Sequence, residues 1–496
     1  MNQTTAATET TTPTKNESTD VEPGSVALST TSMIVSFDGP DDRYNPHNWP
    51  FSKRVYTSLL YSMASFGSVW ASTAYAPANE KVAEQFAVSS EVALLGTSLL
   101  LLGWGFGPFL WAPLSEIYGR KWAVLLPYAV STIMSVGTAT AKDIQTVLLT
   151  RFFTGFLGTA PITCMGGVMV DLWGPSQRGN AIVGYMLLVC GGPNLAPVVG
   201  GAIVLCGASW RWTEYITALL QGTILVLGLV FIDETYSPVL LTRKARALRK
   251  ATGNWALHAE WEEKDIVFKE LAVQFGLRPL QMLLTPICLT VSIYASFIYG
   301  VFYASLASFP ILFQDTRGWN SLEGALPFLA VLVGIVGGAA LSWHSQQHYN
   351  RMLAANGGLA VPEARLPPMK FASFVLAGGL FMMGWASTPS VHWIVPTVGV
   401  AMMGFAFYTI FTSAVNYIVD TFHRWGASAM AANTFARSVF AAALPLLVRP
   451  WYERLGNGWA CSVLGCFAVL NIPIPFVFAK YGPQIRARGK YTSNVT

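Results

Sequence analysis

Two arginines lie inside long apolar runs of this sequence, where a charged side chain is expected to serve a purpose. Arg151 lies a few residues inside the fourth apolar run, and Arg437 lies near the middle of the eleventh. A charge at the centre of a bilayer costs about 2.5–3.5 kcal/mol even on a lenient insertion scale, so such a residue normally faces the protein interior. Each arginine is therefore a candidate contact for a substrate or for a coupling ion. The alternative is a structural link to backbone carbonyls of neighbouring helices.

Polar and aromatic residues at a helical spacing accompany these arginines. Asn433 precedes Arg437 by one helical turn, so the two side chains share a helix face. The same spacing joins three residues of the tenth run and two tyrosines of the seventh. Such stripes are typical of helix packing, but around a central pocket they would suit a bulky, partly apolar molecule. The candidate substrate or coupling contacts are Arg151, Arg437, Asn433, Asn416, Tyr408, Thr412, Tyr299 and Tyr303.

The carboxylates near the apolar runs show the opposite pattern, because they fall at the ends of the runs or in the loops between them. A strongly cationic substrate needs a buried carboxylate as its partner, so neutral or anionic cargo is expected. The carboxylates concerned are Glu116, Asp171, Glu214, Asp233, Asp315, Asp420 and Glu453.

The turn between the second and third runs concentrates charge in the stretch APLSEIYGRK, residues 112–121. Gly119 allows this turn to close tightly, because glycine tolerates positive φ. A cluster of the charged residues with Asp171 would act as a latch that holds two halves of the molecule together in one state and releases them in another. The alternative is that the basic residues only set the orientation of the chain in the membrane. The expected latch comprises Glu116, Gly119, Arg120, Lys121, Asp171 and Arg178.

These residues are carried by an unusually apolar chain. Of its 496 residues, 53% are hydrophobic and 11% are charged, whereas a soluble domain carries about 25% charged residues. A membrane crossing needs about 20 mostly apolar residues, and twelve runs of this kind are present. The sequence therefore predicts an all-α membrane protein with twelve transmembrane helices. The runs cover approximately 55–77, 92–112, 122–140, 145–170, 180–206, 212–232, 286–309, 322–343, 370–388, 391–419, 427–448 and 458–479.

The positions of lysine and arginine predict the orientation of these helices. With the N-terminus in the cytosol, the cytosolic loops hold most of the 31 Lys and Arg residues, and both termini are cytosolic. The stretch LLTRKARALRK (240–250) would suit an amphipathic helix on the anionic inner leaflet or a solvated linker. The expected units are a disordered cytosolic tail (1–45), a six-helix half (46–232), a cytosolic central loop (233–285), a second six-helix half (286–480) and a cytosolic C-terminal tail (481–496).

The two halves show traces of an internal repeat at an offset of 249 residues. Both Asp171 and its counterpart Asp420 fall at the cytosolic end of a run. Together with the matching loops, this predicts two parallel six-helix pseudo-repeats. The pairs at this offset are Trp70 with Trp319, Gly155 with Gly404, and Val170-Asp171 with Val419-Asp420.

Several stretches resemble the major facilitator superfamily. WAPLSEIYGRKW (111–122) is similar to its motif between the second and third helices, with Ala112 and Glu116 in place of the usual glycine and aspartate. RFFTGFLGTAP (151–161) resembles its fourth-helix motif. GGPNLAPVVGG (191–201) resembles the fifth-helix motif associated with antiporters, although Ala196 replaces a common glycine. The residues expected to serve packing or antiport there are Gly192, Pro193, Pro197, Gly200 and Gly201.

Further stretches resemble the fungal drug:proton antiporter branch of this superfamily. The resemblance implies a secondary transporter that exports a small organic molecule, such as a secondary metabolite, toxin or drug, by alternating access in exchange for protons. It implies a monomer in the plasma membrane, or else in the vacuolar membrane, with no cofactor beyond the proton gradient. Glu116, Asp171 and Asp420 are peripheral candidates for the proton site. The stretches are NPHNWPFSKR (45–54), SWRWTEYI (209–216), ETYSPVLLTRKARALRK (234–250) and PEARLPP (362–368).

Two alternatives stay open at this point. One is a transporter of a nutrient or an organic acid, in which Arg151 and Arg437 contact a carboxylate. The other is a non-transporting receptor or an enzyme on the same fold. The sequence contains no nucleotide-binding loop, metal-ligand helix or nucleophile elbow, which disfavours an enzyme, and no basic stripe that would predict a nucleic-acid partner. The expected partners are a small-molecule substrate and the lipid bilayer.

Overall fold

The computed structural model describes residues 33–39, 42–263, 276–357, 361–422 and 425–487, so the outer parts of both expected tails lie outside the described residues. The described chain is helical apart from turns, loops and one bridge between Ile34 and His258. The long helices are α1 (Phe51–Ala74), α3 (Ser90–Ile117), α4 (Arg120–Ala139), α5 (Ile144–Leu172), α6 (Pro175–Leu205), α7 (Arg211–Phe231), α11 (Pro286–Phe309), α12 (Pro327–Ala355), α13 (Pro367–Trp385), α14 (Ile394–Phe422), α15 (Gly426–Asn471) and α16 (Pro473–Ala487). The other helices are η1 (Pro46–Asn48), η2 (Ala76–Ala78), α2 (Asn79–Phe86), α8 (Ser237–Thr252), η3 (Glu260–Glu263), α10 (Arg278–Leu283), η5 (Pro310–Asp315), η6 (Glu323–Ala325) and η7 (Pro362–Arg365).

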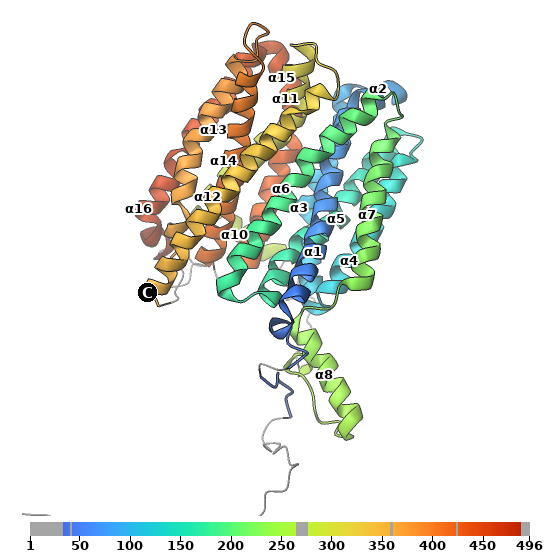
Figure 1. The fold of residues 1–496 in the computed structure, drawn as a ribbon, viewed down its shortest axis with the longest axis vertical. Coiled ribbons are helices and arrows are strands. Elements are labelled where there is room, and N and C mark those ends of the chain that lie inside the picture. Colours follow the sequence, from blue (N-terminus) through green and yellow to red (C-terminus); the bar gives the residue numbers. More distant parts are fainter. Residues whose placement is uncertain (1–32, 40–41, 264–275, 358–360, 423–424, 488–496) are drawn as a thin grey trace, which may run out of the picture.

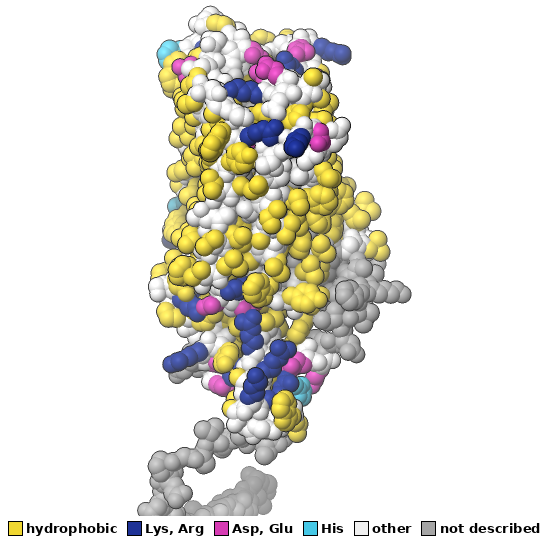
Figure 2. Space-filling model, turned by 90° about the vertical axis from the view of Figure 1, so that its right-hand side faces the viewer, with side chains coloured by type: hydrophobic (Ala, Val, Ile, Leu, Met, Phe, Trp, Pro, Cys, Tyr) yellow, Lys and Arg dark blue, Asp and Glu magenta, His cyan; other side chains and the backbone are white. Residues whose placement is uncertain are grey.

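Twelve membrane crossings can be traced in the part of the chain that the structure describes. Ten segments are long and apolar enough to cross a membrane, and the last of them, Gly426–Ala487, turns back at Gly456 and so supplies two crossings. The remaining crossing is α1, whose serines, among them Ser65 and Ser72, are buried in the bundle and make this helix less apolar than the others. Figure 2 shows a belt of hydrophobic side chains between two charged ends. The predicted fold class is therefore confirmed.

The helices from the two halves of the chain form two bundles that lie side by side (Figure 1). Contacts between α3 and α15 and between α6 and α12 join the two halves. The end of the molecule that carries α8 and the start of α1 is called the α8 face below, and the end that carries α2 is called the α2 face.

Both halves contain the same close helix contact. A Cβ atom added at Gly155 in α5 would lie 2.0 Å from the carbonyl oxygen of Leu100 in α3. The corresponding Gly404 in α14 meets Val331 in α12 in the same way, at 2.3 Å. Only a residue without a side chain permits two backbones to approach so closely. The predicted repeat is thus visible in the packing of the helices.

A turn at the α2 face is repeated as well, which the sequence reading did not identify. Gly207 before α7 has a φ of 73°, and Gly456 has a φ of 75°. The two glycines are related by the offset found for the other pairs, and each is followed three residues later by a tryptophan, Trp210 and Trp459. Positive φ is unfavourable for residues with a side chain, so both turns depend on glycine.

Part of the expected disordered tail is ordered against α8, which points away from the bundle (Figure 1). The N–H of Val35 donates to the carbonyl of His258 at 2.8 Å. The ammonium of Lys244 lies 2.6 Å from the carboxylates of both Asp38 and Asp42. Partial burial opposes the charge of Lys244, but these two hydrogen bonds outweigh it and raise its pKa. Helix α8 covers the basic stretch 240–250 and forms a small folded unit with the chain before α1, so this stretch is not a bare linker.

Candidate functional site

The first buried arginine is fully paired inside the N-terminal half. Arg151 on α5 is completely buried, and its Nη1 lies 3.0 Å from Oε1 of Glu214 on α7. The guanidinium also donates to the carbonyls of Gly96 at 3.1 Å and Ala71 at 2.8 Å, and it faces the ring of Tyr75 at 4.7 Å. Helices α1, α3, α5 and α7 therefore meet at one guanidinium. This geometry is that of the structural link considered above.

Glu214 corrects the expectation that the carboxylates stay at the ends of the helices without entering the interior. It is the fourth residue of α7, yet its side chain is 0% exposed. From sequence alone, a carboxylate near a helix end is expected to face solvent. The residue that pairs with it, Arg151, is 63 positions away in the chain. Its Oε2 has no hydrogen-bond partner among the described residues. One oxygen of this carboxylate is therefore free to accept a proton.

The second buried arginine has a different environment. Arg437 on α15 is 7% exposed, and its guanidinium carbon lies 4.5 Å from the ring centroid of Tyr299 and 4.9 Å from that of Phe411. Within the described chain it forms neither an ion pair nor a hydrogen bond. Tyr185 and Cys190, on α6 in the other half, lie close enough to interact electrostatically with the guanidinium. Arg437 thus lies where the two halves face each other.

Two further candidate contacts lie next to Arg437. Asn433 is 1% exposed, and its Oδ1 has no hydrogen-bond partner among the described residues. The ring centroids of Tyr299 and Tyr303 are 5.1 Å apart, and the Tyr303 hydroxyl lies 3.0 Å from Oγ of Ser72 on α1. Tyr303 therefore joins the halves on the side of Arg437 that is nearer the α2 face.

The candidates on α14 lie on the other side of Arg437, nearer the α8 face. The Tyr408 hydroxyl donates to the carbonyl of Val183 on α6 at 3.3 Å, so this side chain also joins the two halves. Thr412 is buried one turn later, beside Phe411. Asn416 is half-buried on the same helix face. The structure thus brings the predicted residues of α11, α14 and α15 to one interface but leaves Arg151 away from it, paired within the first half.

The charged turn at the α8 face is built as a capped helix start. Gly119 has a φ of 89°, as its sequence context predicts, and Nε of Arg120 lies 3.2 Å from Oδ2 of Asp171. Glu234 accepts hydrogen bonds from the backbone N–H groups of Arg120 at 2.7 Å and Lys121 at 3.2 Å. A carboxylate at this place accepts hydrogen bonds from the free N–H groups at the helix start, and its negative charge interacts favourably with the positive end of the helix dipole. The sequence reading missed Glu234, although it opens the stretch ETYSPVLL.

This cluster lies within one half, whereas the latch was expected to hold the halves together. Glu116, Arg120 and Asp171 belong to α3, α4 and α5, which are all in the first half. Glu116 lies within range of the other two charges without forming an ion pair to a described residue, and Arg178 forms none either. Short loops connect α3 to α4 and α4 to α5, so these side chains meet locally rather than across the interface.

A matching cluster in the second half does reach the first. Asp420 accepts hydrogen bonds from Nε of Arg365 and from the hydroxyl of Tyr349, both at 2.9 Å. Arg365 also donates to the side-chain amide of Gln346. A Cβ atom added at Gly179, at the start of α6, would lie 3.0 Å from that amide. The halves therefore touch at the α8 face through Gly179, which directly follows Arg178, and Gln346.

The glycines of the fifth-helix motif lie at close backbone contacts. A Cβ atom at Gly192 or Gly200 would lie 3.2 Å or 3.0 Å, respectively, from a carbonyl oxygen of α1. At Gly201 the nearest atom, at 2.6 Å, would be the carbonyl oxygen of Ser321 in the other half. Pro193 and Pro197 lie inside α6, which is one helix throughout. This arrangement supports a packing role for the motif, both within the first half and across the interface.

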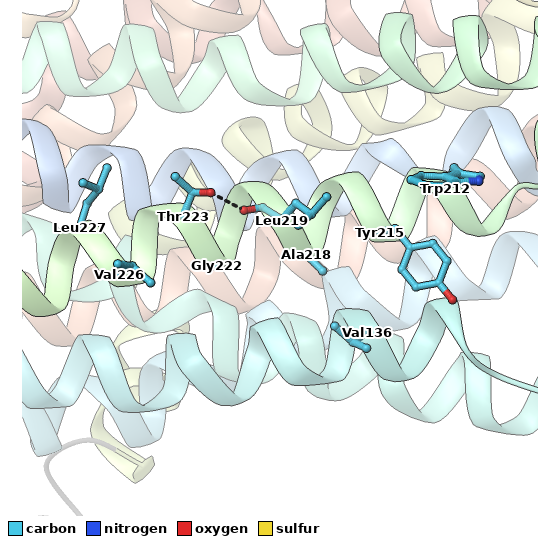
Figure 3. Close-up of a pocket in the computed structure, with 9 residues that line it drawn as sticks. All are labelled: Val136, Trp212, Tyr215, Ala218, Leu219, Gly222, Thr223, Val226 and Leu227. Atoms are coloured by element: carbon cyan, nitrogen blue, oxygen red, sulfur yellow. Dashed lines mark hydrogen bonds between the residues drawn. The ribbon is translucent and has the colours of Figure 1, made fainter.

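A groove of about 800 Å³ on the outside of the first half has a different character (Figure 3). It lies between α4 and α7, and several of its side chains, such as Leu219 and Val226, are more exposed than buried. Its Thr223 hydroxyl is already donated to the carbonyl of Leu219 at 2.8 Å. A groove without charge on the hydrophobic belt suits the acyl chains of lipids, so it is separate from the residues around Arg437.

Comparison with known proteins agrees with this architecture. The Major Facilitator Superfamily profile matches residues 61–445. The efflux pump bik6 of Gibberella fujikuroi is 47% identical over 460 residues, which cover 92% of this chain and 95% of the pump. The multidrug transporter FLU1 of Candida albicans is 38% identical and covers 92% of this chain and 76% of its own. The citrinin biosynthesis cluster transporter mrr1 of Monascus ruber is 38% identical, with 92% of both chains covered.

A solved structure shows the same fold at much lower sequence similarity. The proton:xylose symporter XylE superimposes with a TM-score of 0.64 at 16% identity, over 87% of this chain and 97% of the symporter. The matched relatives are transporters, which argues against the receptor and enzyme alternatives. The chain is thus a multi-pass membrane transporter of the major facilitator superfamily, in the branch of the fungal efflux pumps and multidrug transporters.

Proposed function

We propose that this protein exports a small organic molecule, a secondary metabolite, toxin or drug, in exchange for protons. The observation that carries the proposal is the 47% identity, over nearly the full length of both chains, to a protein named as an efflux pump. The relatives named for a metabolite biosynthesis cluster and for multidrug transport support a small organic molecule as the cargo. The buried residues at the interface between the halves suit a molecule that is partly aromatic and not cationic.

The transporter works as a monomer in the plasma membrane with the α8 face in the cytosol. The support for this orientation is the distribution of lysine and arginine, most of which belong to the loops of that face. Alternating access then requires the halves to separate at one face while they stay in contact at the other. Candidate contacts are Gly179 with Gln346 at the α8 face and Ser72 with Tyr303 towards the α2 face.

Glu214 is the residue that we propose to bind the coupling proton. Three carboxylates are buried in the described chain, and two of them, Asp42 and Glu234, belong to the α8 face. Glu214 alone among the three lies within the helix bundle, next to Arg151. Protonation would remove the negative charge of this pair and weaken the link between α5 and α7. Glu116, Asp171 and Asp420 are more peripheral and take part in the clusters of the α8 face.

The proposal is tested in inside-out vesicles from yeast cells that produce the protein, with an acidic lumen and a panel of fluorescent neutral, anionic and cationic organic compounds. Export predicts accumulation of at least one compound in the lumen, its loss on addition of an uncoupler, and none in vesicles without the protein. Accumulation that is insensitive to the uncoupler would contradict proton exchange. Glu214→Gln is expected to lower the amount of folded protein. Per folded molecule, it should keep substrate exchange at equilibrium but lose the response to the gradient, and an unchanged response would move the proton site to another carboxylate.

A further inference from the structure

The helix bundle contains a buried arginine for which the described part of the chain supplies no hydrogen-bonding partner. The guanidinium of Arg437 has five N–H donors, and none of them is bonded to a described residue, although Arg437 is only 7% exposed and its Nε is fully buried. Arg151 is 0% exposed, but it has a carboxylate and backbone carbonyls as partners. A buried charge without a partner is strongly unfavourable. Arg437 is therefore expected to gain an acceptor during the transport cycle.

Among the residues that the structure describes, no carboxylate is placed to fill this role. Glu214 is engaged by Arg151, and the other carboxylates that are buried in the described chain, Asp42 and Glu234, lie at the α8 face. Contacts with Tyr299 and Phe411 stabilise the cation through the faces of the rings. These contacts leave the hydrogen-bonding edge of the guanidinium unused.

An aromatic wall lies beside this guanidinium and is formed by α11 and α14. Tyr299 lies against Phe411 with 6.0 Å between the ring centroids and an angle of 30° between the planes. Phe411 and Phe407 are nearly parallel at 6.1 Å, and Phe407 stacks on Phe302 at 4.5 Å. Offset stacking on such a wall favours a flat conjugated ring over a flexible aliphatic chain.

Polar atoms of α15 complete the surroundings of Arg437. Oδ1 of Asn433 and Oγ of Ser438 are buried and have no hydrogen-bond partner in the described chain. Ser438 packs against Gly105 of the first half: a Cβ atom added at Gly105 would lie 3.2 Å from the Cβ of Ser438. The strip of α15 that carries the guanidinium therefore faces the other half, and separation of the halves would uncover it.

We infer that Arg437 recognises the acidic group of the cargo and that the cargo is a planar aromatic organic anion whose ring lies on the wall of Tyr299 and Phe411. This inference rests on the proposed export function and narrows its substrate class. A guanidinium binds a carboxylate through two parallel hydrogen bonds, which neither a neutral amide nor an ester reproduces. The hydroxyl of Ser438 can donate to a further oxygen of the same molecule, and Oδ1 of Asn433 can accept from a hydroxyl or N–H group on it.

The experiment compares two probes of equal shape, 2-naphthoate and the neutral 2-naphthamide, by equilibrium binding to the full-length protein in phosphatidylcholine nanodiscs. The parent protein is expected to bind naphthoate at least about tenfold more tightly than naphthamide, because the guanidinium adds a charge-assisted pair. Arg437→Gln should weaken naphthoate binding about tenfold to a hundredfold and leave naphthamide binding unchanged. Arg437→Lys, which keeps the charge but not the fork, should fall between them.

The matched control is Arg449→Gln on the same helix, because Arg449 is 48% exposed and pairs with Glu453; it should bind both probes as the parent does. Equal affinity of the parent for the two probes, or binding of neither, would overturn the inference. So would an equal loss of both probes in Arg437→Lys, which serves as the test if Arg437→Gln does not fold. Binding is measured without a proton gradient, so it does not depend on export. If export fails in vesicles but naphthoate is still preferred, the proposed function is wrong and the inference about Arg437 holds; if the preference is absent, the inference is wrong.

Discussion

Arg151 and Arg437 are both buried in the membrane-spanning bundle, but they differ in their partners. Arg151 connects helices of one half through Glu214 and two carbonyls. Arg437 lies over two aromatic rings at the interface between the halves and has no acceptor in the described chain. The first arginine therefore stabilises one half, and the second lies where the two halves face each other.

Glu214→Gln tests the structural part of this contrast. The change keeps the shape of the side chain but leaves the charge of Arg151 without its counter-charge, and breaking a buried pair in this way costs about 3–5 kcal/mol. We expect a clear fall of the melting temperature of the detergent-solubilised protein, measured by fluorescence-detected size exclusion. Glu453→Gln is the control, because Glu453 is 66% exposed and its pair with Arg449 contributes at most about 1 kcal/mol. Equal melting temperatures of the two variants would contradict the structural role of Glu214.

The positions of both arginines could be read from the sequence, because a charge inside an apolar run stands out. Their partners could not. Glu214 lies in a different helix from Arg151 and only three residues after the start of that helix, so its burial depends on how α5 and α7 pack. The same holds for Glu234, whose contact with Arg120 spans 114 residues. The lack of an acceptor at Arg437 is a property of all its neighbours together, which no local pattern encodes.

At the scale of helices, close backbone contacts repeat between the halves. Gly155 and Gly404 permit α5 and α14 to touch α3 and α12, and Gly207 and Gly456 form corresponding turns.

The predicted runs matched the helices well, since a membrane crossing is defined by length and hydropathy. Their ends were underestimated where a helix continues beyond the apolar part, as α12 does to Ala355. The folded unit on α8 was not predicted, because its contacts join residues near 35 to residues near 258.

Gly155→Ala should disrupt the contact between α5 and α3. The added methyl group would lie 2.0 Å from the carbonyl oxygen of Leu100, so the helices must move apart, and overpacking of this kind costs about 1–3 kcal/mol. The expected result is a lower melting temperature and a lower yield of monodisperse protein. Gly166→Ala on the same helix has nothing within 4 Å of the new atom and should be as stable as the parent or more so. The prediction fails if the two alanine variants behave alike.

The folded unit on α8 should loosen as the pH rises. A hydrogen bond to the Ala256 carbonyl and the neighbouring Glu263 raise the pKa of His258 above its usual 6.5. A raised pKa means that the protonated form is favoured in the folded unit, so this stabilisation is complete below about pH 6.5 and is lost as the pH rises through the raised value. Hydrogen-exchange protection of the Val35 N–H, corrected for intrinsic rates, is therefore expected to be higher at pH 6 than at pH 8. His258→Gln should remove the difference, His344→Gln should keep it, and equal protection of the parent at both values would refute it.

At the scale of the whole molecule, the halves are in contact on both sides of Arg437. Gly179 and Gln346 meet at the α8 face, and Tyr303 and Gly201 meet Ser72 and Ser321 towards the α2 face. The proposed alternating-access cycle would have to break one of these sets of contacts at a time. The charge cluster of Arg120 and Asp171 stays within the first half during such a motion, so it stiffens that half and does not itself form the gate.

A disulfide between the halves tests this assignment of the gate. In a variant with Cys206 and Cys466, the exposed native cysteines, changed to serine, Gly179→Cys and Gln346→Cys should cross-link under oxidant, because an added Cβ at Gly179 lies 3.3 Å from Cγ of Gln346. Transport should stop on oxidation and return on reduction. Gly184→Cys with Gln346→Cys is the control, since Gly184 has nothing within 4 Å, and it should not cross-link. Full transport by the cross-linked protein would show that the halves need not part there.

The repeat has a consequence in evolutionary terms. It points to a six-helix ancestor whose gene was duplicated, and the positions that correspond to Arg151 and Glu214 in the second copy are Val400 and Val463. The second copy therefore lacks the internal ion pair that connects α5 and α7 in the first, and the arginine that it does contain, Arg437, is the one that we propose to contact the cargo. We expect descendants of this gene that handle different molecules to have diverged more in α11, α14 and α15 than in α1, α5 and α7.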